Sequence, residues 1–206
     1  MFRNLFNPES ALMVTMAQVT DCIFLSLFWI LGCFPVVTIG TSFAALYDAT
    51  FRGFRESEKH SWQRFLYVFR QNWKGGILPT AVLLLLVWLL VKGVIGLWNG
   101  AVYGSISWAV FSGGAFLAVT VLGCLSLLMP MLSRFENSFP MLLKNTVLLS
   151  LGNLPRTVVL GAVNAISAML CIRFVWPVFI LPSLAALLGS FLIEPMFKPY
   201  LSEDAV

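Results

Sequence analysis

The sequence predicts an all-α membrane protein, a polytopic helix bundle of about five transmembrane helices with amphipathic helices along its cytoplasmic side. Two observations lead to this class. Hydrophobic residues make up 59% of the 206 and charged residues only 11%, with a mean hydropathy of +0.90, far from the composition of a soluble domain. Residues 77–98 form an almost wholly apolar run, as long as an α-helix must be to cross about 30 Å of hydrocarbon. We therefore expect one integral membrane domain over residues 1–206.

The charges on either side of this central run predict its direction. Residues 99–107 carry no Lys or Arg, whereas basic residues crowd the preceding segment: Arg52, Arg55, Lys59, Arg64, Arg70 and Lys74. Short basic loops stay in the cytoplasm, so the run leaves the cytoplasm at its start. Alternation then places the N-terminus outside and the C-terminus inside the cell. The same bias explains the net charge of +4, and no nucleic-acid partner is predicted.

Two kinds of helix precede the central run. We expect the first span over residues 19–34, ended by Pro35. Apolar residues then recur twice at helical spacing, once behind a cap at Thr41 or Ser42 and once behind Ser61, with basic residues on the opposite face. Both helices are too short and too polar to span, so we expect them along the inner membrane surface.

The rest of the chain predicts three further spans and one further interfacial helix. In order, these are a span over 105–128 closed by Pro130, an interfacial helix over 139–151, and spans over 157–175 and 178–193, the last ending at Pro195. Residues 61–130 and 142–195 also resemble each other, as an amphipathic helix, an Asn, a basic residue and two spans. This pattern fits a parallel repeat of the kind found in transporters, or a chance likeness between apolar sequences.

The sequence carries no recognisable catalytic arrangement. Its single histidine, His60, lies in a polar loop, and the motifs for zinc proteases, serine hydrolases and phosphate-binding loops are absent. The four cysteines fall inside predicted spans without paired spacing. We expect no enzyme, no cofactor and no metal site.

Three charged residues lie near the outer ends of predicted spans and form the first candidate ligand-binding group. Asp21, Lys92 and Arg173 belong to the first, second and fourth spans at similar depth. Because ionisable groups are costly in a membrane, a paired cluster facing a cavity is one interpretation. In the other, Lys92 and Arg173 reach the outer headgroups and Asp21 faces water.

Two further places are candidates for binding. Asn164 lies in the middle of the fourth span, where an amide needs a partner, either another helix or a substrate. Thr38, Gly40, Thr41 and Ser42 place hydroxyl and backbone N–H groups at a helix start near the inner membrane surface. Such a start can bind an anion, for example a lipid headgroup phosphate, or can be a plain helix cap.

Four stretches of the sequence resemble the YesL family of bacterial integral membrane proteins, a domain of unknown function. They are the opening LFNPES, FPVVTIGTSFAALY (34–47), WQRFLYVFRQNWKGG (62–76) and LGNLPRTVVLG (151–161). The resemblance implies a small polytopic protein of the bacterial cell membrane, encoded near carbohydrate uptake systems and glycosidases. It implies no catalytic residues.

Our leading functional hypothesis is a non-enzymatic accessory to bacterial carbohydrate uptake, which follows from the resemblance alone. Its expected partners are membrane lipids and a sugar permease, or a second copy of the chain. The alternative is a small transporter or ligand-binding membrane protein, which the apparent repeat and the outer charges favour.

Overall fold

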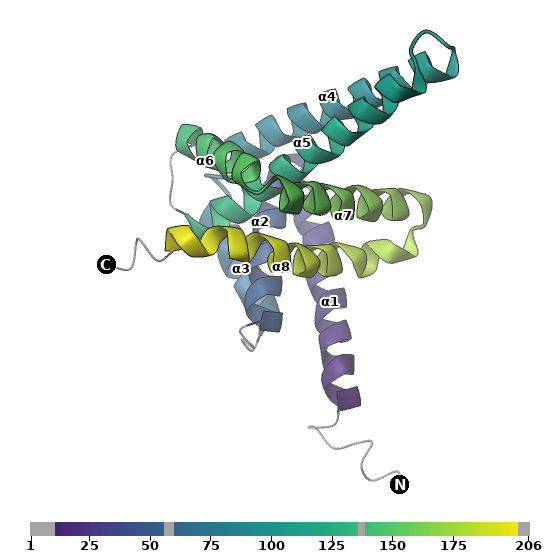
Figure 1. Ribbon diagram of the computed structural model, residues 1–206. Helices are drawn as coiled ribbons and strands as arrows, with labels where there is room; N and C mark the ends of the chain where they lie inside the picture. The colour runs from purple at the N-terminus through teal and green to yellow at the C-terminus, as the bar shows by residue number, and fades with distance from the viewer. Residues whose placement is uncertain (1–10, 56–59, 136–138, 202–206) are drawn as a thin grey trace.

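The computed structural model describes residues 11–55, 60–135 and 139–201, and over these ranges the chain is helical and has no strand (Figure 1). The elements in order are α1 (Ala11–Cys33), η2 (Val36–Thr38), α2 (Ile39–Arg55), α3 (Ser61–Asn72), α4 (Ile77–Val102), α5 (Trp108–Arg134), α6 (Phe139–Gly152), α7 (Leu154–Arg173), η3 (Trp176–Phe179) and α8 (Leu181–Leu201). The predicted all-α class is confirmed. The opening LFNPES segment lies outside the described residues.

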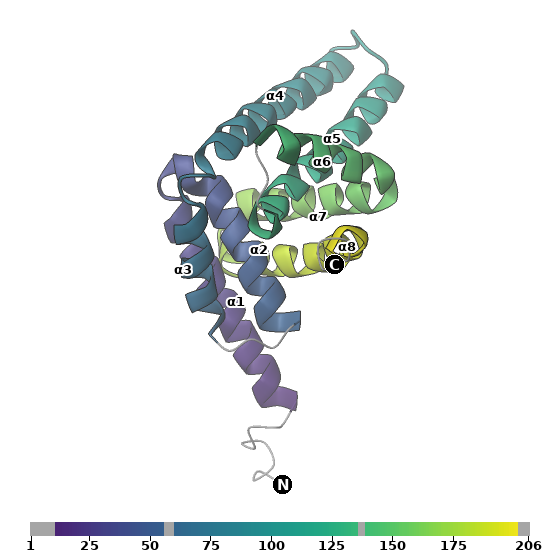
Figure 2. The same cartoon turned by 90° about the vertical axis from the view of Figure 1, so that its left-hand side faces the viewer.

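Helix α2 is the central element of the fold. Its stretch from Gly40 to Phe51 is buried almost throughout, and α1, α3, α4, α5 and α8 all pack against it (Figure 2). The sequence predicts an interfacial helix here, with a free polar face, and that prediction is wrong. Asp48 on this face is fully buried and pairs with Arg52 and Arg64 within the molecule.

Two apolar cores lie on either side of α2. The larger joins α2 to α5, α6, α7 and α8 around Leu127, Leu142 and Phe197. The smaller joins α2 to α1 and α3 around Leu25 and Phe65. Because α2 contributes to both cores, it fixes the position of the two groups of helices relative to each other.

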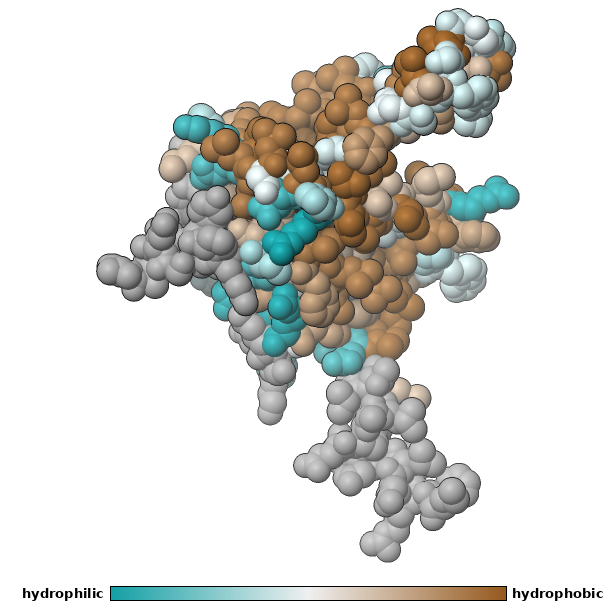
Figure 3. Space-filling model, viewed as in Figure 1, coloured by the Kyte–Doolittle hydropathy of each residue, from teal (hydrophilic) through white to brown (hydrophobic). Residues whose placement is uncertain are grey.

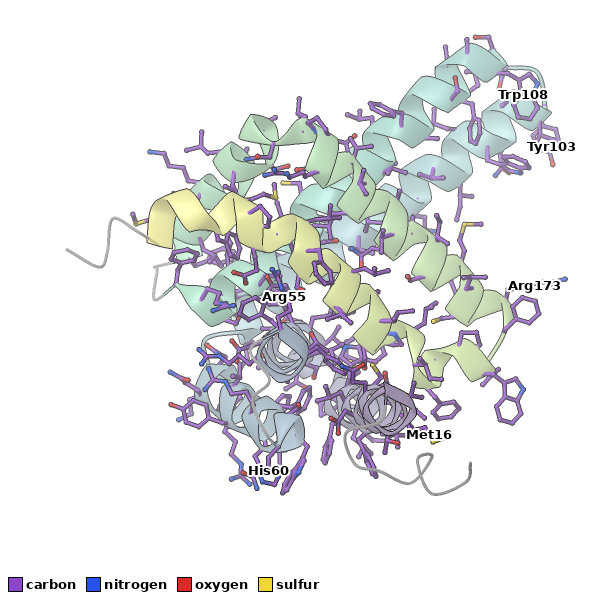
Figure 4. The ribbon with its side chains drawn as sticks, turned by 60° about the horizontal axis from the view of Figure 1, so that its bottom comes forward. Met16, Arg55, His60, Tyr103, Trp108 and Arg173 are labelled. Carbon is purple, nitrogen blue, oxygen red and sulfur yellow. The ribbon has the colours of Figure 1, made fainter. Side chains whose placement is uncertain are left out.

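The long helices run in different directions from this centre. Helices α4 and α5 form a hairpin that projects from the rest as an arm, whereas α7 and α8 run beside each other in another direction (Figure 1). At the tip of the arm Trp98, Trp108 and Phe111 pack edge to face, with ring centroids 5.5–5.9 Å apart. Tyr103 projects from the same tip (Figure 4). Aromatic residues of this kind are typical of a membrane–water boundary.

Two glycines bring the arm and α7 into direct backbone contact. A Cβ atom added at Gly123 of α5 would overlap the carbonyl oxygen of Thr157, and one added at Gly161 of α7 would overlap that of Val119. Small residues let membrane helices approach closely and gain dispersion energy along their backbones. The two helices therefore cross at this pair of glycines and diverge beyond it.

The predicted start of α4 agrees with the structure, whereas the helix ends predicted at two prolines do not. Helix α4 begins at Ile77, as predicted. Pro130 and Pro195, predicted to close spans, instead lie inside α5 and α8, which continue to Arg134 and Leu201. A proline removes one helical hydrogen bond, but packed neighbours make this tolerable in apolar helices. Pro130 is buried in the larger core, where α2 and α6 pack against α5.

Among the described residues, three helices are long and apolar enough to cross a membrane: α4, α5 and α7. Shorter apolar stretches lie in α1 (Gln18–Cys33), α6 (Phe139–Gly152) and α8 (Leu181–Phe197). Only 11% of the most apolar stretch of α4 is buried within the protein, so its surface suits hydrocarbon. Figure 3 shows this apolar surface over the arm and α7, with hydrophilic residues gathered nearer α6 and α8.

Candidate functional site

A cavity of about 490 Å³ lies between the arm and the α7–α8 pair, and residues of α1 and α2 also line it. The lining side chains are apolar apart from a few hydroxyl and amide groups: Trp29, Ile39, Phe43, Tyr47, Leu83, Leu84, Val87, Leu122, Leu125, Ser126, Met129, Pro130, Leu160, Asn164, Ser167, Ala168, Cys171, Ile172, Pro182, Ala185, Ala186, Gly189 and Ile193. No charged residue is among them. Its volume and composition are those of a small-molecule site.

The amide of Asn164 is the main polar group in the middle of the wall. Its Nδ2 atom donates to Oγ of Ser126 on α5, at 3.2 Å, and to the carbonyl oxygen of Leu160, at 2.9 Å. Ser126 in turn donates to the carbonyl oxygen of Leu122. The amide thus links α5 to α7 next to the glycine crossing, as the helix-packing interpretation of Asn164 predicts, and it also borders the cavity.

Tyr47 closes the inner end of the cavity and connects it to a buried ion pair. Its hydroxyl donates to Oε1 of Glu194 on α8, at 3.0 Å, and the same oxygen accepts from Nη2 of Arg134 on α5, at 2.7 Å. Both charged side chains are almost completely buried. Burial raises the pKa of the Tyr47 phenol, and the neighbouring Glu194 carboxylate raises it further. The phenol therefore remains a hydrogen-bond donor.

Asp48, the next residue on α2, is the centre of a second ionic group. Its side chain is fully buried. One carboxylate oxygen pairs with Nε of Arg64 on α3, and the other lies 3.4 Å from Nε of Arg52, one turn further along α2. The pair with Arg64 fastens α3 to α2, whereas the pair with Arg52 stays within one helix.

Arg55 completes the basic group at this end of the molecule (Figure 4). Its Nη1 atom donates to the carbonyl oxygen of Ser190 on α8, at 3.0 Å, and its guanidinium carbon lies 4.8 Å from the ring centre of Phe191 and 5.4 Å from that of Phe51. The adjacent carbonyl of Phe191 has lost its helical donor because residue 195 is proline. Arg55 thus links α2 to α8 in the turn before Pro195.

The structure does not pair the three outer charges in the part of the chain that it describes. Asp21, Lys92 and Arg173 are all exposed and take no part in the salt bridges between described residues. Nζ of Lys92 lies 5.9 Å from the ring centre of Trp88. Arg173 points outward from the end of α7 (Figure 4). This arrangement suits residues that reach headgroups or water.

The four residues at the start of α2 are used inside the protein. Thr38 donates to the carbonyl oxygens of Gly32 and Pro35, and Ser42 donates to that of Thr38. Gly40 packs against Thr80, and Thr41 packs against Gly76. All four are buried, and their contacts are those of a tightly packed helix start.

The residues of the buried ionic groups were missed at the sequence level. Tyr47, Arg134 and Glu194 are far apart in the chain, and each reads alone as a residue at the boundary of a span. One signal was available, since a carboxylate such as Glu194 at the end of an apolar run needs a partner. The described residues contain no group of His, Cys, Asp and Glu side chains arranged to bind a metal ion.

Comparison with known proteins gives one relationship. Residues 22–94 match the model of a family described as a protein of unknown function, DUF624. The match runs from α1 into α4 and contains Tyr47 and Asp48 but not Arg134 or Glu194. No curated protein and no solved structure matches the chain. The family resemblance read from the stretches 34–47 and 62–76 is confirmed there, since both stretches lie within the part of the chain that is similar to the DUF624 family of proteins of unknown function.

Proposed function

We propose that this chain is a non-enzymatic membrane protein that binds an apolar or amphipathic molecule from the bilayer in the cavity between α4–α5 and α7–α8. The cavity is the observation that carries the proposal. Its wall is apolar, uncharged and formed by helices whose outer surfaces are apolar as well. Each methylene group buried there is worth about 0.8 kcal/mol.

The same proposal includes five spans, α1, α4, α5, α7 and α8, with α3 and α6 at the cytoplasmic surface. The distribution of basic residues supports it. The turns over 103–107 and 174–180 carry no Lys or Arg, whereas the opposite ends of the helices carry most of them. In this arrangement the N-terminus is outside, and the C-terminus is in the cytoplasm.

The wall also favours one kind of ligand over another. A sugar carries hydroxyl groups on all sides, and each would lose its partners against leucine, valine and isoleucine side chains. A molecule with an apolar body and few polar groups loses few hydrogen bonds to water when it enters the cavity. The cavity therefore suits a lipid-like ligand.

A filling substitution tests the binding site. Ala168 lines the cavity, and Ala81 lies on the exposed surface of α4 away from it. The full chain is extracted in a mild detergent and its bound molecules are weighed by native mass spectrometry. We expect a retained apolar molecule in the parent protein and in Ala81→Phe, and its loss in Ala168→Phe. A parent protein without such a molecule, or equal retention by both variants, would contradict the proposal.

A second candidate is the accessory role in carbohydrate uptake, through contact with a permease or a second copy of the chain. One surface feature favours a protein contact: Gly93 and Gly96 of α4 have no atom within 4 Å of an added Cβ, which leaves room for another helix. Co-purification with a permease in mild detergent, lost in Gly96→Leu, would support it. Recovery of the chain with lipid alone would count against it.

A further inference from the structure

The amide oxygen of Asn164, in the cavity wall, accepts no hydrogen bond from the described residues. Both amide hydrogens of Asn164 are used, by Ser126 and by the carbonyl oxygen of Leu160. Its own Oδ1 accepts no hydrogen bond from the residues that the structure describes. Nor is this atom enclosed, since the buried side-chain atoms without partners in that part of the chain are Nε1 of Trp29, Oγ1 of Thr41 and Nε of Arg134. Oδ1 is therefore exposed, and Asn164 lines the cavity.

An acceptor without a donor is unfavourable in an apolar wall. At a protein surface, water donates a hydrogen bond to such an oxygen and removes the cost, but hydrocarbon supplies no donor. A ligand that presents an O–H or N–H group at this point gains a hydrogen bond that an otherwise equal ligand cannot make.

The wall restricts the charge of that ligand. No Asp or Glu lines the cavity, so an ammonium group would have no counter-ion there. No Lys, Arg or His lines it either, and the amide hydrogens of Asn164 are occupied. A carboxylate would find only neutral donors, such as Nε1 of Trp29 and the Ser167 hydroxyl, and no counter-ion. A neutral donor is the group that fits.

The wall also restricts the shape. Its residues on α7 run from Leu160 to Ile172, a length of about 18 Å along the helix. Asn164 lies about 6 Å from the inner end of this stretch and about 12 Å from the outer end. The occupant is thus elongated, with its polar group nearer the inner end and its apolar chain directed outward.

We propose that the cavity selects a long-chain neutral molecule with a hydroxyl group, whose O–H donates to Oδ1 of Asn164 while its chain lies along α7. This inference rests on the proposed function, since it names the class of ligand for the same cavity.

The test uses dodecanol and its isostere, undecyl methyl ether, which has an oxygen but no O–H. Binding of each labelled probe to the full chain in lipid nanodiscs is measured against empty nanodiscs, which subtracts partitioning into the bilayer. We expect the parent protein to bind dodecanol about three- to tenfold more tightly than the ether, the size of one neutral hydrogen bond. In Asn164→Leu the two probes bind equally.

Ser126→Ala separates ligand recognition from helix packing. It removes the contact between α5 and α7 but leaves Oδ1 of Asn164 in place, so the preference for dodecanol should survive. Three results would overturn this inference but leave the proposed function standing. They are equal binding of both probes by the parent protein, a preference for dodecanol that persists in Asn164→Leu, and a loss of that preference in Ser126→Ala as large as in Asn164→Leu. Failure of both probes to bind the parent protein would also overturn the proposed function.

Discussion

The Tyr47 hydroxyl and the Nη2 atom of Arg134 donate to the same oxygen, Oε1 of Glu194, at 3.0 and 2.7 Å. This shared acceptor joins α2, α5 and α8 at the inner end of the cavity. Because the three side chains are buried, water cannot replace a partner that is removed.

Glu194→Gln should destabilise the protein strongly. The substitution keeps the shape of the side chain but leaves the Arg134 guanidinium buried without a counter-ion, which costs about 3 kcal/mol. The measurement is the free energy of unfolding in detergent micelles. Asp21→Asn is the matched control, since Asp21 is exposed, and it should change stability by less than about 0.5 kcal/mol. Similar effects of the two substitutions would contradict the importance of the ion pair.

Tyr47 should give stability a pH dependence at alkaline pH. Its pKa is raised in the folded protein, so its contribution is fully present below the pKa of an unfolded tyrosine, about 10, and declines as the pH rises above that value. Tyr47→Phe removes this contribution. The stability difference between the parent and Tyr47→Phe should therefore shrink between about pH 9 and pH 11. A difference that stays constant or grows over this range would show that the phenol is not protected from ionisation.

Gly123→Ala should weaken the crossing of α5 and α7. The new methyl group meets the backbone carbonyl of Thr157, which cannot move aside as a flexible side chain can, so we expect a loss of about 1–3 kcal/mol. Gly113→Ala on the same helix is the control, since no atom lies within 4 Å of its added Cβ. It should be neutral or stabilising, because alanine favours the helix. Thermal unfolding of both variants in one detergent makes the comparison, and equal midpoints would argue against close contact at Gly123.

The proposed orientation can be tested with single cysteines in a background without the four native ones. Tyr103 lies exposed at the tip of the arm, and His60 lies exposed at the start of α3. In intact cells a membrane-impermeant maleimide should label Tyr103→Cys directly and His60→Cys only after permeabilisation. The reverse pattern would overturn the orientation.

The sequence predicted the helical class, the start of α4 at Ile77 and the apolar runs, because these depend on local composition and length. It misplaced the ends of α5 and α8, because a proline breaks an isolated helix but is tolerated where neighbours surround it, as they surround Pro130. It also placed the helix behind Thr41 or Ser42 at the membrane surface, whereas Asp48 of this helix is buried in a pair with Arg64 of a different helix.

The candidate site was predictable in part. Asn164 stands out as an amide within an apolar run, and it borders the cavity. The ionic groups were not predictable by the same means, since Glu194 and Tyr47 are separated by 147 residues and only the fold brings them together. The hydroxyl groups near the start of α2 look alike in sequence whether they are free or bonded. The hydrogen bonds of Thr38 and Ser42 to nearby carbonyls become visible only in the folded chain.

Tyr47 and Asp48 are neighbours on α2, yet successive side chains of a helix point about 100° apart. Tyr47 is joined through Glu194 to α8 and α5, and Asp48 is paired with Arg64 of α3. Helix α2 therefore holds the two groups of helices through polar contacts on two different faces. A rotation of α2 about its own axis that breaks the Tyr47–Glu194 hydrogen bond must also displace Asp48 from Arg64. Movements of α3 and of the α5–α8 group about α2 are consequently coupled.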